Sequence, residues 1–343
     1  MDKRVIFAVA GSGKTSLIID KINQNSRCLI ITYTENNFKN LKHRIFEKFG
    51  CIPRGIKVYT YFTFIYSFCF KPLLGHQMKI KGICWDTPPY FTLRLKRSDG
   101  RFYIDKHKRL YHNRIAKLFE QCEILGEINE RIEKYFDHIC IDEVQDFGGH
   151  DFNFLTQIAK ANVDQLLVGD FYQHTFDTSR DGNTNKALHT CYTQYKQKFI
   201  DAGFTIDSET LSHSYRCSST VCNFVKGNIG IDVSSHREDA TSVEFVDRED
   251  RAAELFNCNE TVKLFYQASH KYPGFTSNWG ATKGENHYND VCVVLNATTM
   301  EKYSKGKLKD LPSSTKNKLY VACTRANRHL FLIPERYLSA FKK

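Results

Sequence analysis

The sequence has 343 residues, of which 41% are hydrophobic, and a formal net charge of +11. This length is enough for two or three compact subdomains, each with its own core. No apolar run approaches the about 18 residues that a membrane span needs, which excludes a membrane-spanning chain and indicates a globular one with no membrane partner. No signal peptide precedes the first expected strand, so we expect a cytoplasmic location.

Apolar runs and helical periodicities alternate along the chain, without an internal repeat. The alternation is typical of an α/β fold with parallel sheets covered on both faces. Residues 72–135 interrupt it, and we expect them to form an insertion into the first sheet domain. The expected strands cover residues 4–9, 28–33, 57–60, 138–141, 165–168, 205–211, 242–246, 291–295 and 329–333.

The twelve cysteines are scattered and include no C-x-x-C pair. Several lie inside apolar strands, as in RCLIITY and HICIDE. We therefore expect buried free thiols, and the alternative is a metal or redox site.

The stretch RVIFAVAGSGKTS, residues 4–16, joins an expected strand to an expected helix through a glycine-rich turn. Such a turn aims backbone N–H groups at one point, where the helix dipole also favours negative charge. Lys14 would reach the β- and γ-phosphates of a nucleoside triphosphate, and the Thr15 hydroxyl would coordinate Mg²⁺. The alternative is an ordinary strand–turn–helix connection. The residues predicted to surround the phosphates are Ala10, Gly11, Ser12, Gly13, Lys14, Thr15 and Ser16.

A second candidate lies in HICIDEVQDF, where Asp142 and Glu143 follow an apolar strand. Open α/β sheets bind ligands at the carboxyl ends of their strands. There Asp142 would hold Mg²⁺, and Glu143 would orient or deprotonate the attacking water. The alternative is a helix N-terminus rich in acidic residues.

Basic residues gather between Arg94 and Lys117, where nine Lys or Arg stand against two Asp. Such a patch suits a phosphate backbone, because neutralised phosphates release condensed counterions. A solvated helix face is the alternative. The apolar period from Tyr111 onward predicts a helix with its basic residues on the wet side. The nine are Arg94, Lys96, Arg97, Arg101, Lys106, Lys108, Arg109, Arg114 and Lys117.

Eight short motifs appear in an order that resembles the UvrD/Rep/PcrA group of superfamily 1 helicases. They extend from about residue 5 to residue 333, and they are AVAGSGKT, ITYTEN, VYTYFTF, IDEVQD, VGDFYQHTF, SHSYRC, WGATKGE and LYVACTRA. The resemblance implies a P-loop NTPase with two RecA-like parallel-sheet domains, with ATP in the cleft between them and single-stranded DNA across the top. It implies a first domain of residues 1–71 and 136–202, a small inserted subdomain of residues 72–135 and a second domain of residues 203–343.

The resemblance also implies roles around ATP. Gln173 would contact the γ-phosphate, and Arg216 and Arg325 would act as arginine fingers from the second domain. Tyr215 would stack on the adenine. Glu285 lies one position before the family's ribose-contacting glutamate. The family's adenine-reading glutamine lies upstream of the phosphate loop, and only seven residues precede Ala8 here, so we expect loose discrimination of the base.

For the DNA, the resemblance implies contacts from residues of ITYTEN and VYTYFTF. Aromatic rings in these segments would stack on bases, and the alternative for Tyr33 and Tyr61 is that they are core aromatics at strand ends. Phe62 stands where many relatives have histidine, and Trp279 falls in a motif where relatives carry Thr-x-His. The implied contacts are Thr32, Tyr33, Asn36, Thr60 and Tyr61.

Three functions agree with these motifs. The first is an ATP-dependent helicase or translocase that moves along single-stranded DNA, 3′ to 5′ as in relatives. The second is an ATP-gated DNA sensor that works with a partner such as a nuclease, as in antiviral defence systems. The third is an ATPase that acts on RNA or on no nucleic acid. Arginines at positions 216 and 325 favour the motor, because a pure binding module has little use for them.

Overall fold

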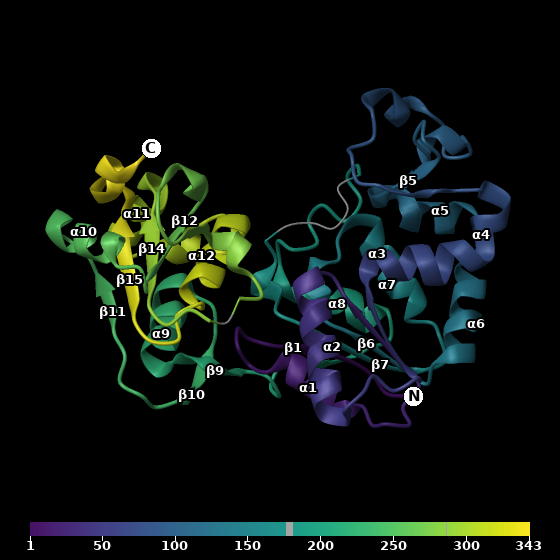
Figure 1. Ribbon diagram of the computed structural model, residues 1–343, viewed down its shortest axis with the longest axis horizontal. Coiled ribbons are helices and arrows are strands. Elements are labelled where there is room, and N and C mark those ends of the chain that lie inside the picture. Colours follow the sequence, from purple (N-terminus) through teal and green to yellow (C-terminus); the bar gives the residue numbers. More distant parts are fainter. Residues whose placement is uncertain (176–180, 286) are drawn as a thin grey trace. The chain divides into compact units, whose positions relative to one another are not determined.

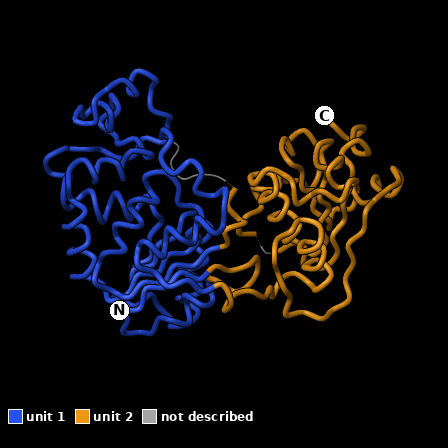
Figure 2. Tube along the Cα trace, turned by 180° about the vertical axis from the view of Figure 1, so that it is seen from behind, with its two compact units in different colours: residues 1–6, 15–169, 176–207 blue, residues 7–14, 170–175, 208–343 orange. Residues whose placement is uncertain are grey.

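A computed structural model of the chain describes residues 1–175, 181–285 and 287–343. The chain divides into two compact units, which are described separately (Figure 2). Unit 1 contains Met1–Ile6, Thr15–Gly169 and Phe176–Asp207, and unit 2 contains Phe7–Lys14, Asp170–Thr175 and Ser208–Lys343. The glycine-rich turn therefore belongs, by its contacts, to unit 2.

Unit 1 is built on a six-stranded sheet with the order β3-β2-β6-β7-β1-β8. The pairs β2/β3, β2/β6, β6/β7 and β1/β8 are parallel. Strand β2 is buried along its whole length, as expected for a central strand covered on both faces. The strands are β1 Lys3–Phe7, β2 Cys28–Thr32, β3 Ile56–Thr60, β6 His138–Ile141, β7 Asp164–Gly169 and β8 Thr205–Asp207.

Helix α2 of unit 1 begins and ends at recognisable signals. The hydroxyl of Thr34 accepts the N–H of Asn37 at 3.2 Å and caps α2, which ends at Gly50 with a φ of 71°. Short turns of π or 3-10 geometry join the strands and helices, among them η1 Phe64–Phe70 and η5 Val144–Asp146. The helices are α1 Lys14–Lys21, α2 Glu35–Phe49, α3 Tyr61–Thr63, α4 Lys71–Met78, α5 Ile115–Gln121, α6 Leu125–Tyr135, α7 Gly149–Ile158 and α8 Tyr192–Asp201.

Between α4 and α5 the chain forms a small region, drawn in blue beyond α5 in Figure 1. Its strands β4 Gly82–Cys84 and β5 Arg109–Tyr111 form a parallel pair, in which Ile83 lies opposite Leu110. Three 3-10 turns complete it: η2 Tyr90–Arg94, η3 Gly100–Phe102 and η4 His112–Arg114.

Two of the basic residues in this region are not on a wet face. Arg114 and Lys117 are buried, and both bind the carboxylate of Asp181, with 3.1 Å from Arg114 Nε to Oδ2. The Arg114 guanidinium also lies 3.9 Å from the centre of the Phe102 ring. The helical-face prediction was wrong for these two residues because their carboxylate partner lies 64 or more positions away in sequence.

Unit 2 contains a five-stranded sheet with the order β11-β15-β14-β12-β13, parallel throughout. In β14, Val291 and Val293 enter one apolar cluster, and Cys292 and Val294 enter another, so both faces of the sheet are covered. The strands are β11 Val243–Phe245, β12 Val262–Phe265, β13 Thr276–Asn278, β14 Val291–Leu295 and β15 Leu330–Pro334.

A separate parallel pair, β9 His213–Ser218 and β10 Ser234–Arg237, also belongs to unit 2. The other elements of the unit are α9 Ser219–Phe224, η7 Val225–Ile229, α10 Glu249–Asn257, η8 Ser269–Lys271, η9 Trp279–Thr282, α11 Ala297–Ser304, η10 Leu308–Asp310, α12 Ser313–Cys323 and η11 Glu335–Phe341, with η6 Phe171–Gln173.

The α/β class with parallel sheets is confirmed, and each expected strand is present, although the first, second, sixth and seventh are shorter than predicted. Strand β12 was missed because it contains Lys263. This lysine is buried, and its ammonium donates to the carbonyl of Cys258 at 2.8 Å and that of Thr261 at 3.0 Å. Strands β4, β5, β9, β10 and β13 are short or polar and carried no apolar signal.

All twelve cysteines are free; eight are buried as expected, Cys191 and Cys258 are half-buried, and Cys51 and Cys122 are exposed. Among the described residues, no helix has the length and apolar character to cross a membrane. No cluster of three or more His, Cys, Asp or Glu side chains in that part of the chain is arranged to hold a metal ion.

The ion pairs of Asp181 yield a stability prediction. Burial raises the pKa of Asp181, but hydrogen bonds from Lys117 and Arg114 outweigh it, so the pKa is lowered overall. The stabilisation is therefore present above the unfolded-state pKa of about 3.9 and is lost as the pH falls through the lower folded-state value. We expect Asp181→Asn to cost about 3 kcal/mol at pH 7, measured by urea unfolding, because two buried cations lose their partner.

The control is Glu301→Gln, which removes an exposed partner of Lys305. It should leave the unfolding midpoint unchanged. Equal effects of the two substitutions, or a pH-independent difference between wild type and Asp181→Asn, would contradict the assignment.

Candidate nucleotide and nucleic-acid site

The glycine-rich turn lies between β1 and α1, as predicted. Gly11 and Gly13 have φ values of 71° and 90°, which residues with a side chain rarely adopt. The Ser12 hydroxyl donates to the carbonyl of Val9 at 2.9 Å and closes the turn. Lys14 and Thr15 begin α1, where the first N–H groups of a helix have no partner within the helix. This geometry agrees with the anion-binding turn expected from the sequence.

Gly11 is also required by a close approach within unit 2. A Cβ atom at this position would lie 2.6 Å from Cβ of Arg216 and 2.9 Å from Oγ of Ser214. The carbonyl of Gly11 accepts the N–H of Tyr215 at 2.9 Å. The structure thus brings together the turn and the SYRC segment, two parts of the predicted site.

A buried tyrosine that sequence reasoning missed connects the turn to two other motifs. Tyr320 Oη accepts the N–H of Ala10 at 2.9 Å and donates to Oδ2 of Asp170 at 2.9 Å. Burial, and then the charge of Asp170, raise the pKa of Tyr320 well above its usual value, so the hydroxyl keeps the proton that it donates. Gln173 is buried three residues after Asp170. The sequence shows this tyrosine inside LYVACTRA, but its two partners lie 150 and 310 positions away, so no local pattern pointed to the contacts.

The acidic pair lies at the end of β6 in unit 1. Asp142 and Glu143 are both buried, and the Asp142 carboxylate accepts the N–H of Glu143 at 3.0 Å. Glu143 has a φ of 60° and a ψ of 46°, a left-handed conformation that costs free energy in a residue other than glycine. The side-chain amide of Gln145 donates to the Glu143 carboxylate. Gln145, which was not predicted, therefore orients the group expected to activate water.

The two predicted arginine fingers share one neighbourhood of unit 2. Arg216 Nη1 donates to the carbonyl of Thr324 at 3.2 Å. Arg325 is buried, and its guanidinium donates to the carbonyls of Val321 at 3.2 Å and Glu285 at 2.8 Å. The Glu285 side chain instead accepts the hydroxyl of Tyr288. Glu285 thus contributes its backbone to this neighbourhood.

Tyr215, the predicted adenine platform, is 64% exposed. Its ring stacks on His236 from β10, with centroids 4.1 Å apart and planes inclined by 17°. The stack holds the tyrosine ring in a fixed orientation.

Trp279 is a core residue of unit 2, and this explains its departure from the related motif. The side chain is fully buried and the indole N–H donates to the carbonyl of Leu264 at 2.9 Å. An indole in this position ties η9 to β12.

The residues expected to hold DNA differ in exposure: Thr60 is buried, Tyr33 is half-buried, and Asn36 alone among the five is exposed. Tyr33 and Thr60 line a cavity of about 380 Å³ at the carboxyl ends of β2 and β3. Asn36 is exposed at the start of α2. Thr32 is buried, and Tyr61 is buried with its hydroxyl donating to Oδ1 of Asp151 at 2.8 Å. Tyr61 is therefore a core aromatic, as the alternative interpretation had it.

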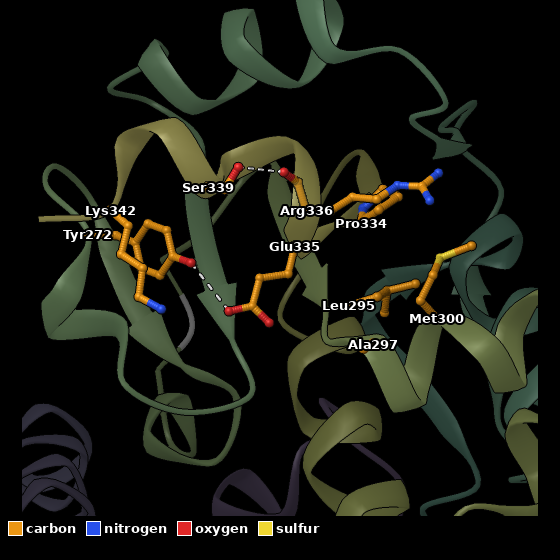
Figure 3. Close-up of a pocket in the computed structure, with 9 residues that line it drawn as sticks. All are labelled: Tyr272, Leu295, Ala297, Met300, Pro334, Glu335, Arg336, Ser339 and Lys342. Atoms are coloured by element: carbon orange, nitrogen blue, oxygen red, sulfur yellow. Dashed lines mark hydrogen bonds between the residues drawn. The ribbon is translucent and has the colours of Figure 1, made fainter.

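A second cavity, of about 470 Å³, lies in unit 2 at the carboxyl ends of β14 and β15 (Figure 3). Glu335 lies between Tyr272, whose hydroxyl donates to its carboxylate at 3.2 Å, and an apolar wall that includes Leu295 and Met300. Arg336 and Lys342 also line it. None of the residues predicted from the sequence lines this cavity.

Thr15 and Asp142 offer Mg²⁺ the ligands that it prefers. Mg²⁺ takes oxygen ligands, and next to a nucleotide it uses one or two protein groups, with phosphate and water completing the shell. A hydroxyl at the start of α1 and a carboxylate at the end of β6 agree with that requirement.

The hydroxyl of Tyr320 provides a second prediction. Tyr320→Phe removes the partner of the buried Ala10 N–H and one partner of Asp170, so we expect a decrease of about 1–3 kcal/mol in the free energy of unfolding. The matched control is Tyr303→Phe, which removes a hydroxyl from a part-exposed ring of unit 2. Urea unfolding of both variants measures the difference, and an equal decrease in the two would contradict the assigned hydrogen bonds.

Comparison with known proteins finds similarity to solved structures only. The sequence matches no family model, and no curated protein is significantly similar to it. A crystal structure of arterivirus nonstructural protein 10, a helicase, is similar with a TM-score of 0.52 at 13% identity, over 99% of this chain and 62% of that one. The same helicase in complex with DNA gives 0.51 at 13% identity, over 99% and 63%. The chain spans less than two thirds of the length of these proteins. It has a helicase fold with RecA-like parallel-sheet domains.

Proposed function

We propose that the chain is a DNA-stimulated ATPase of the UvrD-like helicase type, which moves along single-stranded DNA in the 3′ to 5′ direction. The observation that carries the proposal is the pairing of two motifs in one sheet. An anion-binding turn follows β1, and two adjacent acidic residues follow β6, with only β7 between the two strands. A hydrolytic triphosphate site requires both parts.

In this proposal Lys14 binds the β- and γ-phosphates of ATP, and Thr15 and Asp142 hold Mg²⁺. The ion would neutralise charge on the phosphate oxygens. Glu143 accepts the proton of the attacking water, and the hydrogen bond from Gln145 fixes the direction of its carboxylate. The strained backbone of Glu143 supports this role, because such strain concentrates at functional sites.

Gln173, Arg216 and Arg325 would respond to the γ-phosphate. All three belong to unit 2, whereas Thr15, Asp142 and Glu143 belong to unit 1. A change in the position of one unit relative to the other during hydrolysis would then move the DNA. Arginine fingers of this kind contribute about 10³- to 10⁵-fold in rate. In this scheme Tyr215 stacks on the adenine and is supported from behind by His236.

DNA would contact unit 1 through Tyr33, Thr60 and the exposed basic residues of residues 94–108. One similar structure is a complex with DNA, which supports a nucleic-acid track on this fold. Arg94, Lys96, Arg97, Lys106 and Lys108 are exposed, unlike Arg114 and Lys117.

Hydrolysis tests the proposal. We expect ATP hydrolysis to rise when single-stranded DNA is added, and Lys14→Ala to lower the rate at least about 100-fold, because the transferring phosphate loses a positioned cation. Lys21→Ala, at the exposed end of the same helix, should hydrolyse ATP at the wild-type rate. No hydrolysis by the wild type, or equal rates in the wild type and Lys14→Ala, would refute the proposed function.

The basic residues give a separate prediction. Replacing Arg94, Lys96 and Arg97 by Gln should weaken DNA binding and reduce its dependence on salt, by about 0.7 in the log–log slope for each phosphate that the protein no longer neutralises. The control replaces three exposed lysines of unit 2, Lys226, Lys305 and Lys307, with the same change in net charge. Anisotropy titrations at several salt concentrations measure both slopes. An unchanged slope in the first variant would mean that these residues form a solvated surface and do not neutralise DNA phosphates.

A further inference from the structure

The cavity of about 380 Å³ in unit 1 is lined largely by aromatic side chains. Four of its lining residues are aromatic: Tyr33, Phe62, Tyr66 and Trp85. They come from different parts of the sequence, since Tyr33 follows β2, Phe62 lies in α3, Tyr66 lies in η1 and Trp85 follows β4. The last of these belongs to the inserted region and was not singled out in the sequence.

Three of these rings and one histidine form a continuous row. The ring of Phe62 lies 5.9 Å from that of Tyr33 and 4.8 Å from that of Trp85, edge to face in both cases. The ring of His112 lies 5.5 Å from that of Trp85 and 5.8 Å from that of Phe62. Phe62, which stands where many relatives have histidine, thus braces Trp85.

The backbone also fixes the position of Trp85. It directly follows Cys84, which lies opposite Tyr111 in the β4/β5 pair. The ring nitrogen Nδ1 of His112 lies 3.2 Å from the carbonyl oxygen of Cys84. Trp85 is nevertheless 60% exposed, so an indole ring is held in place with much of its surface in water. An exposed, braced aromatic ring at the edge of an aromatic cavity is suited to stacking with another flat ring.

The surroundings indicate which ring would be bound. Exposed aromatic residues Tyr90 and Phe91 lie in the same inserted region, with the exposed cations Arg94 and Lys96 close by in sequence. The combination of aromatic surfaces with positive charge is typical of surfaces that bind single strands, because each base has a π face and each linkage a phosphate. Bases in a duplex are stacked on one another and have no free face to offer.

We infer that Trp85 stacks on an unpaired base of a single strand that enters this cavity, which Tyr33 also lines. This inference rests on the proposed function, since it assigns a base-binding site to the proposed DNA-binding surface. It predicts that the inserted region binds the bases as well as the phosphates of the strand. The binding is independent of base identity, because stacking uses the ring face rather than the hydrogen-bonding edge.

The chain has two tryptophans, which makes the test direct. Trp279 is fully buried in unit 2, so Trp85 is the exposed fluorophore. We expect an oligothymidylate to quench the fluorescence of Trp85, and an abasic oligonucleotide of the same length and charge to leave it largely unquenched. Trp85→Phe should remove the quenching while retaining a ring for stacking.

Affinity provides a second readout. Trp85→Ala should weaken binding of labelled oligothymidylate by about 5- to 150-fold, the equivalent of one stacked base. The control, Phe46→Ala, removes a 56% exposed ring from α2, outside the cavity, and should bind as the wild type does. Phe46→Ala should also leave ATP hydrolysis without DNA unchanged.

The outcomes separate this inference from the function on which it rests. DNA-stimulated hydrolysis together with wild-type affinity in Trp85→Ala would overturn the inference alone. Equal quenching by the abasic oligonucleotide would also overturn it, because the contact would then be with the backbone. Quenching by oligothymidylate without ATP hydrolysis would support the base site and refute the proposed function.

Discussion

The hydroxyl group of Tyr320 is the contact on which the arrangement of unit 2 depends. It joins the backbone of the glycine-rich turn to Asp170, three residues before Gln173, and it stands on α12, which leads directly to Arg325. The turn is also tied to the SYRC segment by the Gly11–Tyr215 hydrogen bond. Four segments distant in sequence are thus held by a few buried polar contacts, each expensive to leave unsatisfied. These contacts link the glycine-rich turn to the segments that contain Gln173, Arg216 and Arg325.

In unit 1, neighbouring aromatic rings hold the exposed ring of Trp85 in one orientation. In the row from Tyr33 to His112, Phe62 makes edge-to-face contacts with the other three rings, and the rings of Trp85 and His112 are inclined by 31°, so each ring limits the motion of the next. The buried pairs of Asp181 with Arg114 and Lys117 anchor η4 and α5, which follow β5 within the inserted region. Anchoring of this kind would reduce the entropic cost of binding a strand.

Features that depend on short segments could be predicted from the sequence, and contacts between distant residues could not. The turn at Gly11 and Gly13 and the acidic pair after β6 were predictable, because glycine spacing and strand ends are properties of short segments. Tyr320, Gln145 and the burial of Arg114 depend on partners distant in the chain or on the exact direction of a side chain, which no local pattern reports. Phe62 and Trp279 looked like departures from a related motif. In the structure each serves packing, Phe62 by bracing Trp85 and Trp279 by filling the core of unit 2 and bonding to β12.

The claim that this fold works as a directional motor is tested most directly by displacement of streptavidin from biotinylated single-stranded DNA in the presence of ATP. A motor that moves from 3′ to 5′ displaces streptavidin from the 5′ end faster than from the 3′ end, and Lys14→Ala displaces it from neither. Hydrolysis stimulated by DNA without displacement from either end would contradict the motor and favour an ATP-gated sensor that acts through a partner such as a nuclease.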